Sequence, residues 1–298
     1  MKKLFFFLFL LPFTLLSQDY REVWVDHDGI SHYVRIFGEG EPILLINGGP
    51  GMNSNGFEGL ASTLAESYQV ILYDQRGTGK SSMENPTPES LTLNVMATDI
   101  EMIRVALEID EWVVMGQSFG GILAYTYASR YPTRIRGMIQ SSSGGMDLGI
   151  RGNVLIQDRL TAPQRDSLSY YQNLVNTGHE EYGAKRREFL AYAYVYNDDH
   201  APVIAARLAE ANLEINGMVW NNMATNEYDV KQEMLSFQPP VLILQGEFDV
   251  VDISLAETAH AVLPESTLRV VPNSGHYGWV ENPDFYFSEI YAFLESLD

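Results

Sequence analysis

The chain of 298 residues is long enough to bury one large core, and its 46% hydrophobic and 12% aromatic content is ordinary for a globular protein. It contains no cysteine, which excludes disulfides, thiolate metal ligands and a cysteine nucleophile. The formal net charge is −20. A surface this acidic disfavours nucleic acid and anionic lipid as partners, because binding to both depends on Lys and Arg contacts with phosphate, whereas a cationic substrate would be tolerated.

The first residues have the pattern of an export signal. A basic start (Met-Lys-Lys, residues 1–3) is followed by an apolar run over residues 4–16 and a polar stretch from Ser17 onward. We predict a cleavable signal peptide over residues 1–17 and export to the periplasm or outside the cell. A retained anchor is the alternative, but a spanning helix needs about twenty apolar residues, so we expect no stable membrane insertion after cleavage.

Short apolar runs alternate with longer segments of helical period in the rest of the chain. This alternation predicts an α/β protein with a mostly parallel central sheet flanked by helices. The expected strands are residues 23–26 and 33–37, which form a hairpin around Asp28 and Gly29, and the buried runs 43–46, 70–73, 113–115, 138–140, 241–244 and 268–271. The expected helices include residues 91–109, 254–263 and 284–297, where apolar residues recur at three- and four-residue steps.

The strand pattern is interrupted once. From residue 144 to 236 the sequence is helical in character and rich in Tyr and polar residues, and the strand pattern resumes after two prolines at 239–240. We therefore predict a helical cap at 144–236, inserted into a core made of 18–143 and 237–298.

The strongest chemical signal is Gly-Gln-Ser-Phe-Gly at residues 116–120. The motif alone arises by chance, but here an apolar strand candidate leads into it and a helix with a small first turn follows. This strand, tight turn and helix are what a nucleophile elbow requires, with Ser118 at the strained position and glycines on both flanks. We therefore predict an α/β-hydrolase fold whose nucleophile is Ser118.

A serine nucleophile needs a base, and the base needs an acid that fixes its tautomer. In this fold the chain order is Ser, then Asp or Glu, then His. Asp249 follows the strand 241–244 and His276 follows the strand 268–271, so both are expected at the edge where parallel strands end. Alternatives for the acid are Asp252, Asp147 and Glu247; the remaining histidines lack a strand-then-loop setting.

Two N–H donors must stabilise the oxyanion of an acyl-transfer intermediate. Phe119 follows the nucleophile and supplies the first. The second is expected from the loop after the strand 43–46, where the sequence is Asn-Gly-Gly-Pro-Gly at residues 47–51, with Gly49 preferred and Gly48 as the alternative. The sequence shows no metal-ligand constellation and no cofactor fingerprint, so neither is expected.

Several of these motifs together resemble one family. The blocks at residues 47–51, 73–81, 116–121 and 246–249 are similar to those of proline iminopeptidases and the related tricorn-interacting aminopeptidases, and the resemblance covers residues 20–144 and 239–297. It implies removal of an N-terminal residue, often proline, from a short peptide, with acidic cap residues binding the free amine. Within the block at 73–81, we expect Asp74 and Arg76 to brace their loop.

The resemblance also suggests residues in the cap. The segment 220–228 is similar to one that carries an amine-binding glutamate, which would be Glu227, with Trp220 beside it. A second glutamate stays open between Glu188 and Glu214. Candidate aromatic lid residues are Tyr182, Tyr192, Tyr194, Tyr196 and Trp220, and at least one of the alternate residues Tyr192, Tyr194 and Tyr196 is expected to lie outside the lid.

Two positions depart from the family pattern and leave proline specificity open. Asn47 stands where the family has His, and Phe119 stands where Trp or Tyr is frequent. Three functions follow as hypotheses: an exported aminopeptidase of the proline iminopeptidase type, a carboxylic-ester hydrolase with the same triad, and a catalytically silent ligand-binding protein. The expected partner is a small peptide or ester; the sequence does not indicate the oligomeric state.

Overall fold

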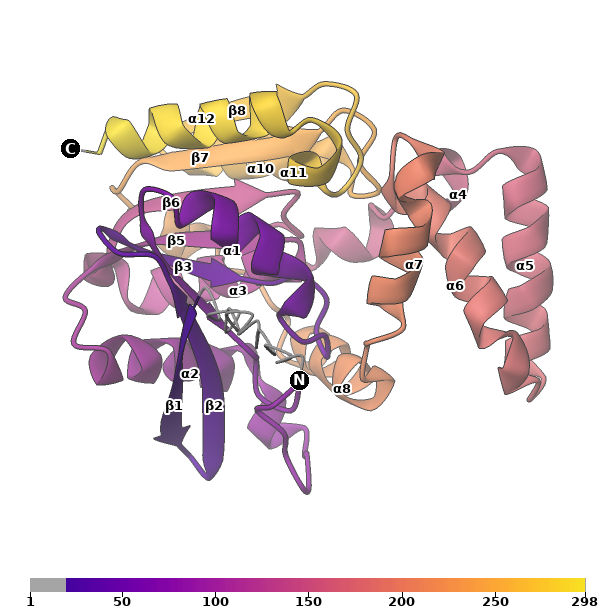
Figure 1. Cartoon of the computed structure of the whole chain (residues 1–298), viewed down its shortest axis with the longest axis horizontal. Coiled ribbons are helices and arrows are strands. Elements are labelled where there is room, and N and C mark those ends of the chain that lie inside the picture. The colour runs from indigo at the N-terminus through magenta and orange to yellow at the C-terminus, as the bar shows by residue number, and fades with distance from the viewer. Residues whose placement is uncertain (1–19, 298) are drawn as a thin grey trace, which may run out of the picture.

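An eight-stranded sheet in the order β1-β2-β4-β3-β5-β6-β7-β8 forms the centre of the molecule (Figure 1). The computed structural model describes residues 20–297, so the predicted signal peptide lies outside the described residues. The strands are β1 (Tyr20–His27), β2 (Ile30–Phe37), β3 (Pro42–Ile46), β4 (Gln69–Tyr73), β5 (Trp112–Gln117), β6 (Ile135–Ser141), β7 (Val241–Gly246) and β8 (Ser266–Val271). β1 and β2 pair antiparallel with their neighbours, and every pairing from β4 to β8 is parallel.

Helices cover both faces of this sheet. Successive residues of a strand point to opposite faces, so Leu44 and Ile46 join one hydrophobic cluster while Ile43 and Leu45 join the other. The first cluster includes buried side chains of α2 (Leu93–Ala106), α3 (Phe119–Arg130) and α10 (Ile253–Val262), and the second includes those of α1 (Glu58–Leu64) and α12 (Pro283–Glu295). Burial on both faces explains why the parallel strands appear in the sequence as continuous apolar runs.

The predicted fold class, the hairpin and all eight strands are confirmed, but the prediction that residues 268–271 are fully buried is wrong. β8 is the last strand of the sheet, and Arg269 and Val270 on it are exposed. An edge strand is covered on fewer sides than a central one, and the apolar run alone does not show which strand lies at the edge. The helices α2, α10 and α12 match the predicted segments to within a few residues, whereas α1 was not predicted.

Between β6 and β7 the chain forms helices, joined by turns and short 3-10 segments; we call this segment, residues 144–236, the cap. They are α4 (Ile156–Arg159), α5 (Ala162–Asn176), α6 (Gly183–Ala191), α7 (Ala201–Leu208), α8 (Leu213–Thr225) and α9 (Lys231–Met234). Figure 1 shows α5, α6 and α7 to one side of the sheet, with α8 nearer the core. No helix within residues 20–297 is both long and apolar enough to span a bilayer.

Arg76 and Asp74 brace the loop after β4, as the sequence predicts. The Arg76 guanidinium donates two hydrogen bonds of 2.6 Å to the buried Asp99 carboxylate on α2. Asp74 accepts hydrogen bonds from the backbone and hydroxyl of Ser54 and from the backbone of Lys80. Neither Arg76 nor Asp74 is among the residues that line the cavity at Ser118.

We expect Asp99→Asn to lower the free energy of unfolding by about 3–5 kcal/mol, because it leaves the buried Arg76 guanidinium with only the exposed Asp28 carboxylate, 3.5 Å away, as a counter-charge. Burial alone would raise the pKa of the Asp99 carboxyl, but the interactions with Arg76 and His32 together outweigh burial and lower it. The contribution is therefore present above the unfolded-state pKa of about 3.9 and is lost as the pH falls through the lower folded-state value. Urea unfolding at neutral and acid pH measures both effects.

Glu289→Gln is the matched control, since its partner Arg269 is half-exposed and such pairs contribute less than about 1 kcal/mol. Equal losses for the two variants would contradict the bracing role of Asp99.

Candidate active site

Ser118 occupies a sharp turn between β5 and α3. Its backbone has φ 55° and ψ −120°, a conformation that residues other than glycine rarely adopt. Its N–H donates to the Ser141 carbonyl, and its carbonyl accepts from the N–H groups of Gly121 and Gly144, each over 3.0 Å. Strain of this kind persists when several contacts fix the backbone, and it is common at functional positions.

A close backbone approach makes the turn possible. A Cβ on Gly120 would lie 2.1 Å from the carbonyl oxygen of Ile46, which is far inside contact distance. Only glycine therefore allows the first turn of α3 to pack against the end of β3. This contact brings Ser118 next to the glycine loop that follows β3.

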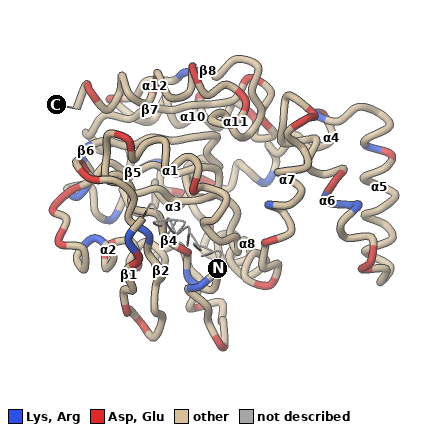
Figure 2. Tube along the Cα trace, viewed as in Figure 1, with Lys and Arg blue, Asp and Glu red and all other residues tan. Residues whose placement is uncertain are grey.

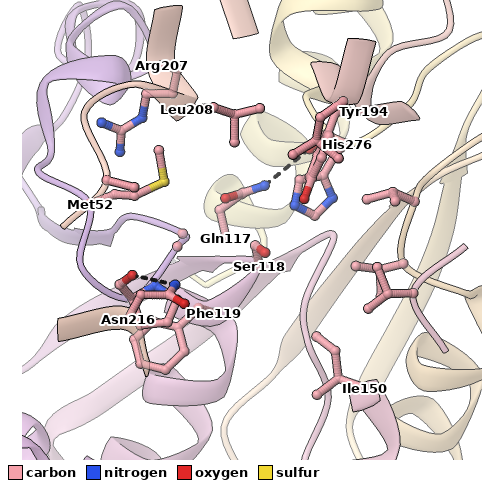
Figure 3. A pocket seen from close by; sticks show the side chains of 18 of the residues that line it. Met52, Gln117, Ser118, Phe119, Ile150, Tyr194, Arg207, Leu208, Asn216 and His276 are labelled. Atoms are coloured by element: carbon pink, nitrogen blue, oxygen red, sulfur yellow. Dashed lines mark hydrogen bonds between the residues drawn. The ribbon is translucent and has the colours of Figure 1, made fainter. Parts of the chain in front are cut away.

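His276 and Asp249 lie in the loops after β8 and β7. Since these strands are parallel neighbours, their carboxyl ends share one edge of the sheet. The Nδ1 of His276 lies 2.7 Å from Oδ1 of Asp249, an oxygen that also accepts the N–H of Val251 over 2.9 Å. A carboxylate at Nδ1 favours the tautomer with the proton there, which leaves Nε2 able to accept a proton. His276 and Ser118 line the same cavity (Figure 3).

The other acids considered from the sequence are engaged elsewhere. Asp252 accepts a backbone hydrogen bond at the start of α10, and Asp147 pairs with Lys231. Glu247 accepts the backbone N–H of Asn273. Within the described residues, Asp249 is the carboxylate that contacts the imidazole.

Two residues that the sequence analysis did not assign to this role hold the His276 loop in place. Gln117 Nε2 donates to the carbonyl of His276 over 3.2 Å, as the dashed line in Figure 3 shows. The N–H of His276 donates to the carbonyl of Tyr194 over 2.8 Å, and the Tyr194 ring packs edge-on against the imidazole at 5.5 Å. Gln117 holds the loop from the sheet and Tyr194 holds it from the cap. The sequence signal that could have identified Gln117 is a polar residue at the end of the otherwise apolar strand β5.

The glycine loop lies directly against Ser118. A Cβ on Gly48 would lie 2.8 Å from Cβ of Ser118 and 2.1 Å from Oε1 of Gln117. Gly48 and Gly49 both line the cavity, and Phe119 is the first residue of α3, so its N–H has no acceptor within the helix. This arrangement gives the predicted oxyanion donors Phe119, Gly49 and Gly48 access to one region beside Ser118.

Asn47 shows how this chain replaces the family histidine. Its Nδ2 donates to the carbonyls of Gly48 and Met52 over 3.1 and 3.0 Å, and its own carbonyl accepts from Gln75. From the cap, Asn216 on α8 donates to the carbonyl of Pro50 over 2.8 Å (Figure 3). The glycine loop is therefore held from the core and from the cap.

The cavity at Ser118 has a volume of about 530 Å³, which suits a small molecule. Of the predicted aromatic lid, Trp220 and Tyr194 line it, and Trp220 packs edge-on against Phe119 with ring centroids 6.1 Å apart. Tyr182, Tyr192 and Tyr196 do not line it. The apolar side chains of the lining are Pro50, Met52, Phe57, Phe119, Ile150, Val154, Leu190, Leu208, Ala211, Leu213, Trp220, Val250 and Val251.

Glu227, which the sequence predicts to bind a substrate amine, does not line this cavity. Glu227 is exposed and lines a second cavity beyond the end of α8. It lies two residues beyond the end of α8, the helix that carries Trp220. Glu188 and Glu214 do not line the Ser118 cavity either, and no Asp or Glu of residues 20–297 does.

The described part of the chain contains no cluster of three or more His, Asp or Glu side chains that could hold a metal ion.

Comparison with known proteins agrees with this geometry. A family model described as the alpha/beta hydrolase fold matches residues 41–283. The chain belongs to the α/β-hydrolase fold family. It is 27% identical to a proline iminopeptidase of Thermoplasma volcanium, over 91% of this chain and 96% of that protein, and 27% identical to one of Clostridioides difficile, over 93% and 99%.

The solved structures that are similar to this one include both peptidases and esterases. The proline iminopeptidase of Mycobacterium smegmatis superposes with a TM-score of 0.76 at 20% identity, covering 93% of this chain and 98% of that one. A thermophilic esterase from Thermogutta terrifontis superposes with a TM-score of 0.72 at 21% identity, covering 93% and 99%. At these identities the structures support the fold alone.

We expect Ser118→Ala to lower kcat at least about 10⁴-fold on any substrate that the protein hydrolyses, such as p-nitrophenyl acetate, because the nucleophile is lost. Ser142→Ala is the matched control, since Ser142 is also buried at a strand end with a positive φ of 47° but does not line the cavity. A Ser118→Ala protein that is folded by circular dichroism and keeps full turnover would refute the assignment.

Gly48→Ala should lower kcat/KM about a hundredfold, because the added methyl forces the glycine loop away from Ser118 and Gln117. Gly59→Ala provides the comparison, as a Cβ there meets nothing within 4 Å and alanine favours the helix. Equal activity of the two variants would contradict a part for the glycine loop in the reaction at Ser118.

Proposed function

We propose that the protein is a serine hydrolase that cleaves carboxylic ester or amide bonds through an acyl-enzyme on Ser118. The supporting observation is the strained Ser118 in the same cavity as His276, whose Nδ1 is held 2.7 Å from the buried Asp249. Ser118, His276 and Asp249 are the three residue types that a Ser-His-Asp mechanism needs, which supports their assignment to these roles. This completeness disfavours the alternative of a catalytically silent binding protein.

The reaction would proceed in two steps. His276 Nε2 takes the Ser118 proton as the oxygen attacks the substrate carbonyl, and Asp249 stabilises the imidazolium. The N–H groups of Phe119 and Gly49 stabilise the oxyanion, and the imidazolium then gives its proton to the leaving alcohol or amine. Water attacks the acyl-enzyme by the same route and regenerates Ser118.

The two candidate substrate classes are supported by different observations. Similarity to proline iminopeptidases over most of the chain supports removal of an N-terminal residue from short peptides. The cavity favours a carboxylic ester without a free amine, because no described carboxylate lines it and much of its lining is aliphatic and aromatic. A free ammonium bound there would have no counter-charge. We therefore infer that ester hydrolysis fits the site best and keep the aminopeptidase as the second candidate.

Export remains part of the proposal. It is supported by the basic start and the apolar run of residues 1–16, together with the polar stretch that follows.

A side-by-side assay of p-nitrophenyl butyrate, prolyl p-nitroanilide and N-acetylprolyl p-nitroanilide distinguishes the candidates. We expect the butyrate ester to have the highest kcat/KM and the free amine to give no advantage over the acetylated anilide, since the cavity offers no described carboxylate to the amine. A kcat/KM more than about tenfold higher for the free-amine anilide would establish the aminopeptidase instead. The Ser118→Ala protein serves as the blank for all three substrates.

A further inference from the structure

The charged side chains that line the cavity, apart from the His276 imidazole, are all arginines: Arg151, Arg186 and Arg207. Burial raises the pKa of the lining phenols Tyr194 and Tyr277, so they add no negative charge. The chain as a whole has 39 acidic and 19 basic residues. A cation-lined cavity in so acidic a protein is a local reversal of charge.

Arg207 is already neutralised by its own neighbours. Its guanidinium lies 2.8 Å from the Glu210 carboxylate, donates to Asn53 over 2.9 Å and stacks over the Phe57 ring at 5.8 Å. Figure 3 shows it beside Met52. Its donors are used to attach α7 to the core, so it is not the group that gives the cavity its positive charge.

Arg186 on α6 has no such counter-charge. It is half-buried and donates to the neutral side chain of Gln172 over 3.1 Å, and it forms no ion pair within residues 20–297. Burial, followed by the adjacent cation Arg187, lowers the pKa of its guanidinium, which nevertheless stays charged at neutral pH. Figure 2 shows basic residues on α6. A partly desolvated cation without a partner is costly unless a ligand supplies the opposite charge.

Arg151 reaches the same cavity from a separate segment. It belongs to the 3-10 turn Leu148–Gly152 that follows β6, is exposed, and also lacks an ion pair within the described residues. Two unpaired guanidinium groups from two elements therefore border one cavity. Both favour an anion as the ligand of this cavity.

The position of Arg186 relative to the reacting centre follows from the helix. Arg186 and Leu190 lie four residues apart on α6, Tyr194 follows in the 3-10 turn Tyr192–Tyr194, and all three line the cavity; Tyr194 also packs against His276. At 1.5 Å per residue, Arg186 lies roughly 6 Å along α6 from Leu190, on the side away from Tyr194. An elongated substrate with its scissile bond at Ser118 would place an apolar segment beside Leu190 before it reaches the guanidinium.

We propose that the substrate of Ser118 carries a carboxylate or phosphate, separated from the scissile carbonyl by an apolar segment, and that Arg186 binds this anion with help from Arg151. The planar guanidinium presents paired donors that match the oxygens of either anion. The inference rests on the proposed hydrolase function and adds the substrate class. It also explains why no described Asp or Glu lines the cavity, as the binding of a free amine would require.

The test uses p-nitrophenyl esters of equal chain length that end in a methyl, a carboxylate, a phosphate or an ammonium group. A second series carries the same four end groups on the alcohol side of butyrate esters, so that either direction of binding is covered. We expect an anionic ester to exceed the methyl ester about tenfold or more in kcat/KM in at least one series, and the ammonium ester to be the poorest. The better anion identifies the carboxylate or the phosphate.

Arg186→Gln should abolish this preference, lowering kcat/KM for the anionic ester about ten- to a hundredfold while the methyl ester changes less than about threefold. Arg186→Lys should restore part of it, because the charge returns without the paired geometry. Arg187→Gln is the matched control, since it removes the same charge from the next residue of α6, which does not line the cavity. For the exposed Arg151→Gln we expect a smaller loss, about two- to fivefold.

The outcomes separate the inference from the hydrolase function on which it rests. Equal rates for all end groups, a preference for the ammonium, or equal effects of Arg186→Gln and Arg187→Gln would overturn the anion site while Ser118-dependent turnover of the methyl ester still supports the hydrolase. Turnover that survives in Ser118→Ala would instead overturn the hydrolase assignment.

Discussion

The close approach of three backbone segments around Ser118 is the constraint on which the rest of the site depends. Ser118 has a positive φ, the first turn of α3 packs against the end of β3 at Gly120, and the glycine loop touches Ser118 at Gly48. Each contact excludes a side chain larger than hydrogen. The same three segments carry the nucleophile and the proposed oxyanion donors, so packing and chemistry are set together.

The cap contributes structure to the site as well as a wall to the cavity. Asn216 on α8 holds the glycine loop, and the carbonyl of Tyr194 holds the His276 backbone. The imidazole is thus fixed by Asp249 within the core and by the cap outside it. Changes in the cap are therefore expected to affect the rate of the chemical step as well as substrate affinity, because the glycine loop and the His276 loop are both held partly by the cap.

Local charge in the cavity differs from the charge of the whole protein. The net charge of −20 indicates tolerance of cationic ligands, yet the charged groups beside Ser118 are guanidinium groups, and the unpaired ones belong to Arg186 and Arg151. Coulomb interactions decay within about 10 Å in salt, so a ligand in the cavity experiences its immediate neighbours more than the distant surface. The relatives' peptidase activity and the cavity's electrostatics therefore support different substrates on one fold, which is common among folds that host many reactions.

The sequence by itself determined the fold class, the strands and the identity of the residues grouped at the site. Ser118, Asp249 and His276 could be found because each follows an apolar strand, and strand ends in a parallel sheet share one edge. Each of these patterns spans only a few residues, so it can be recognised without knowledge of the fold.

The tertiary structure decided what the cap contributes. Helical segments signal their own period but not which face meets the core, so the position of Glu227 outside the cavity and of Arg186 within it could not be obtained from sequence spacing. The same limit applied to the edge position of β8 and to the part played by Gln117, whose partner lies 159 residues away. Contacts between residues distant in the chain depend on how whole elements pack, and this packing determines which side chains line the cavity.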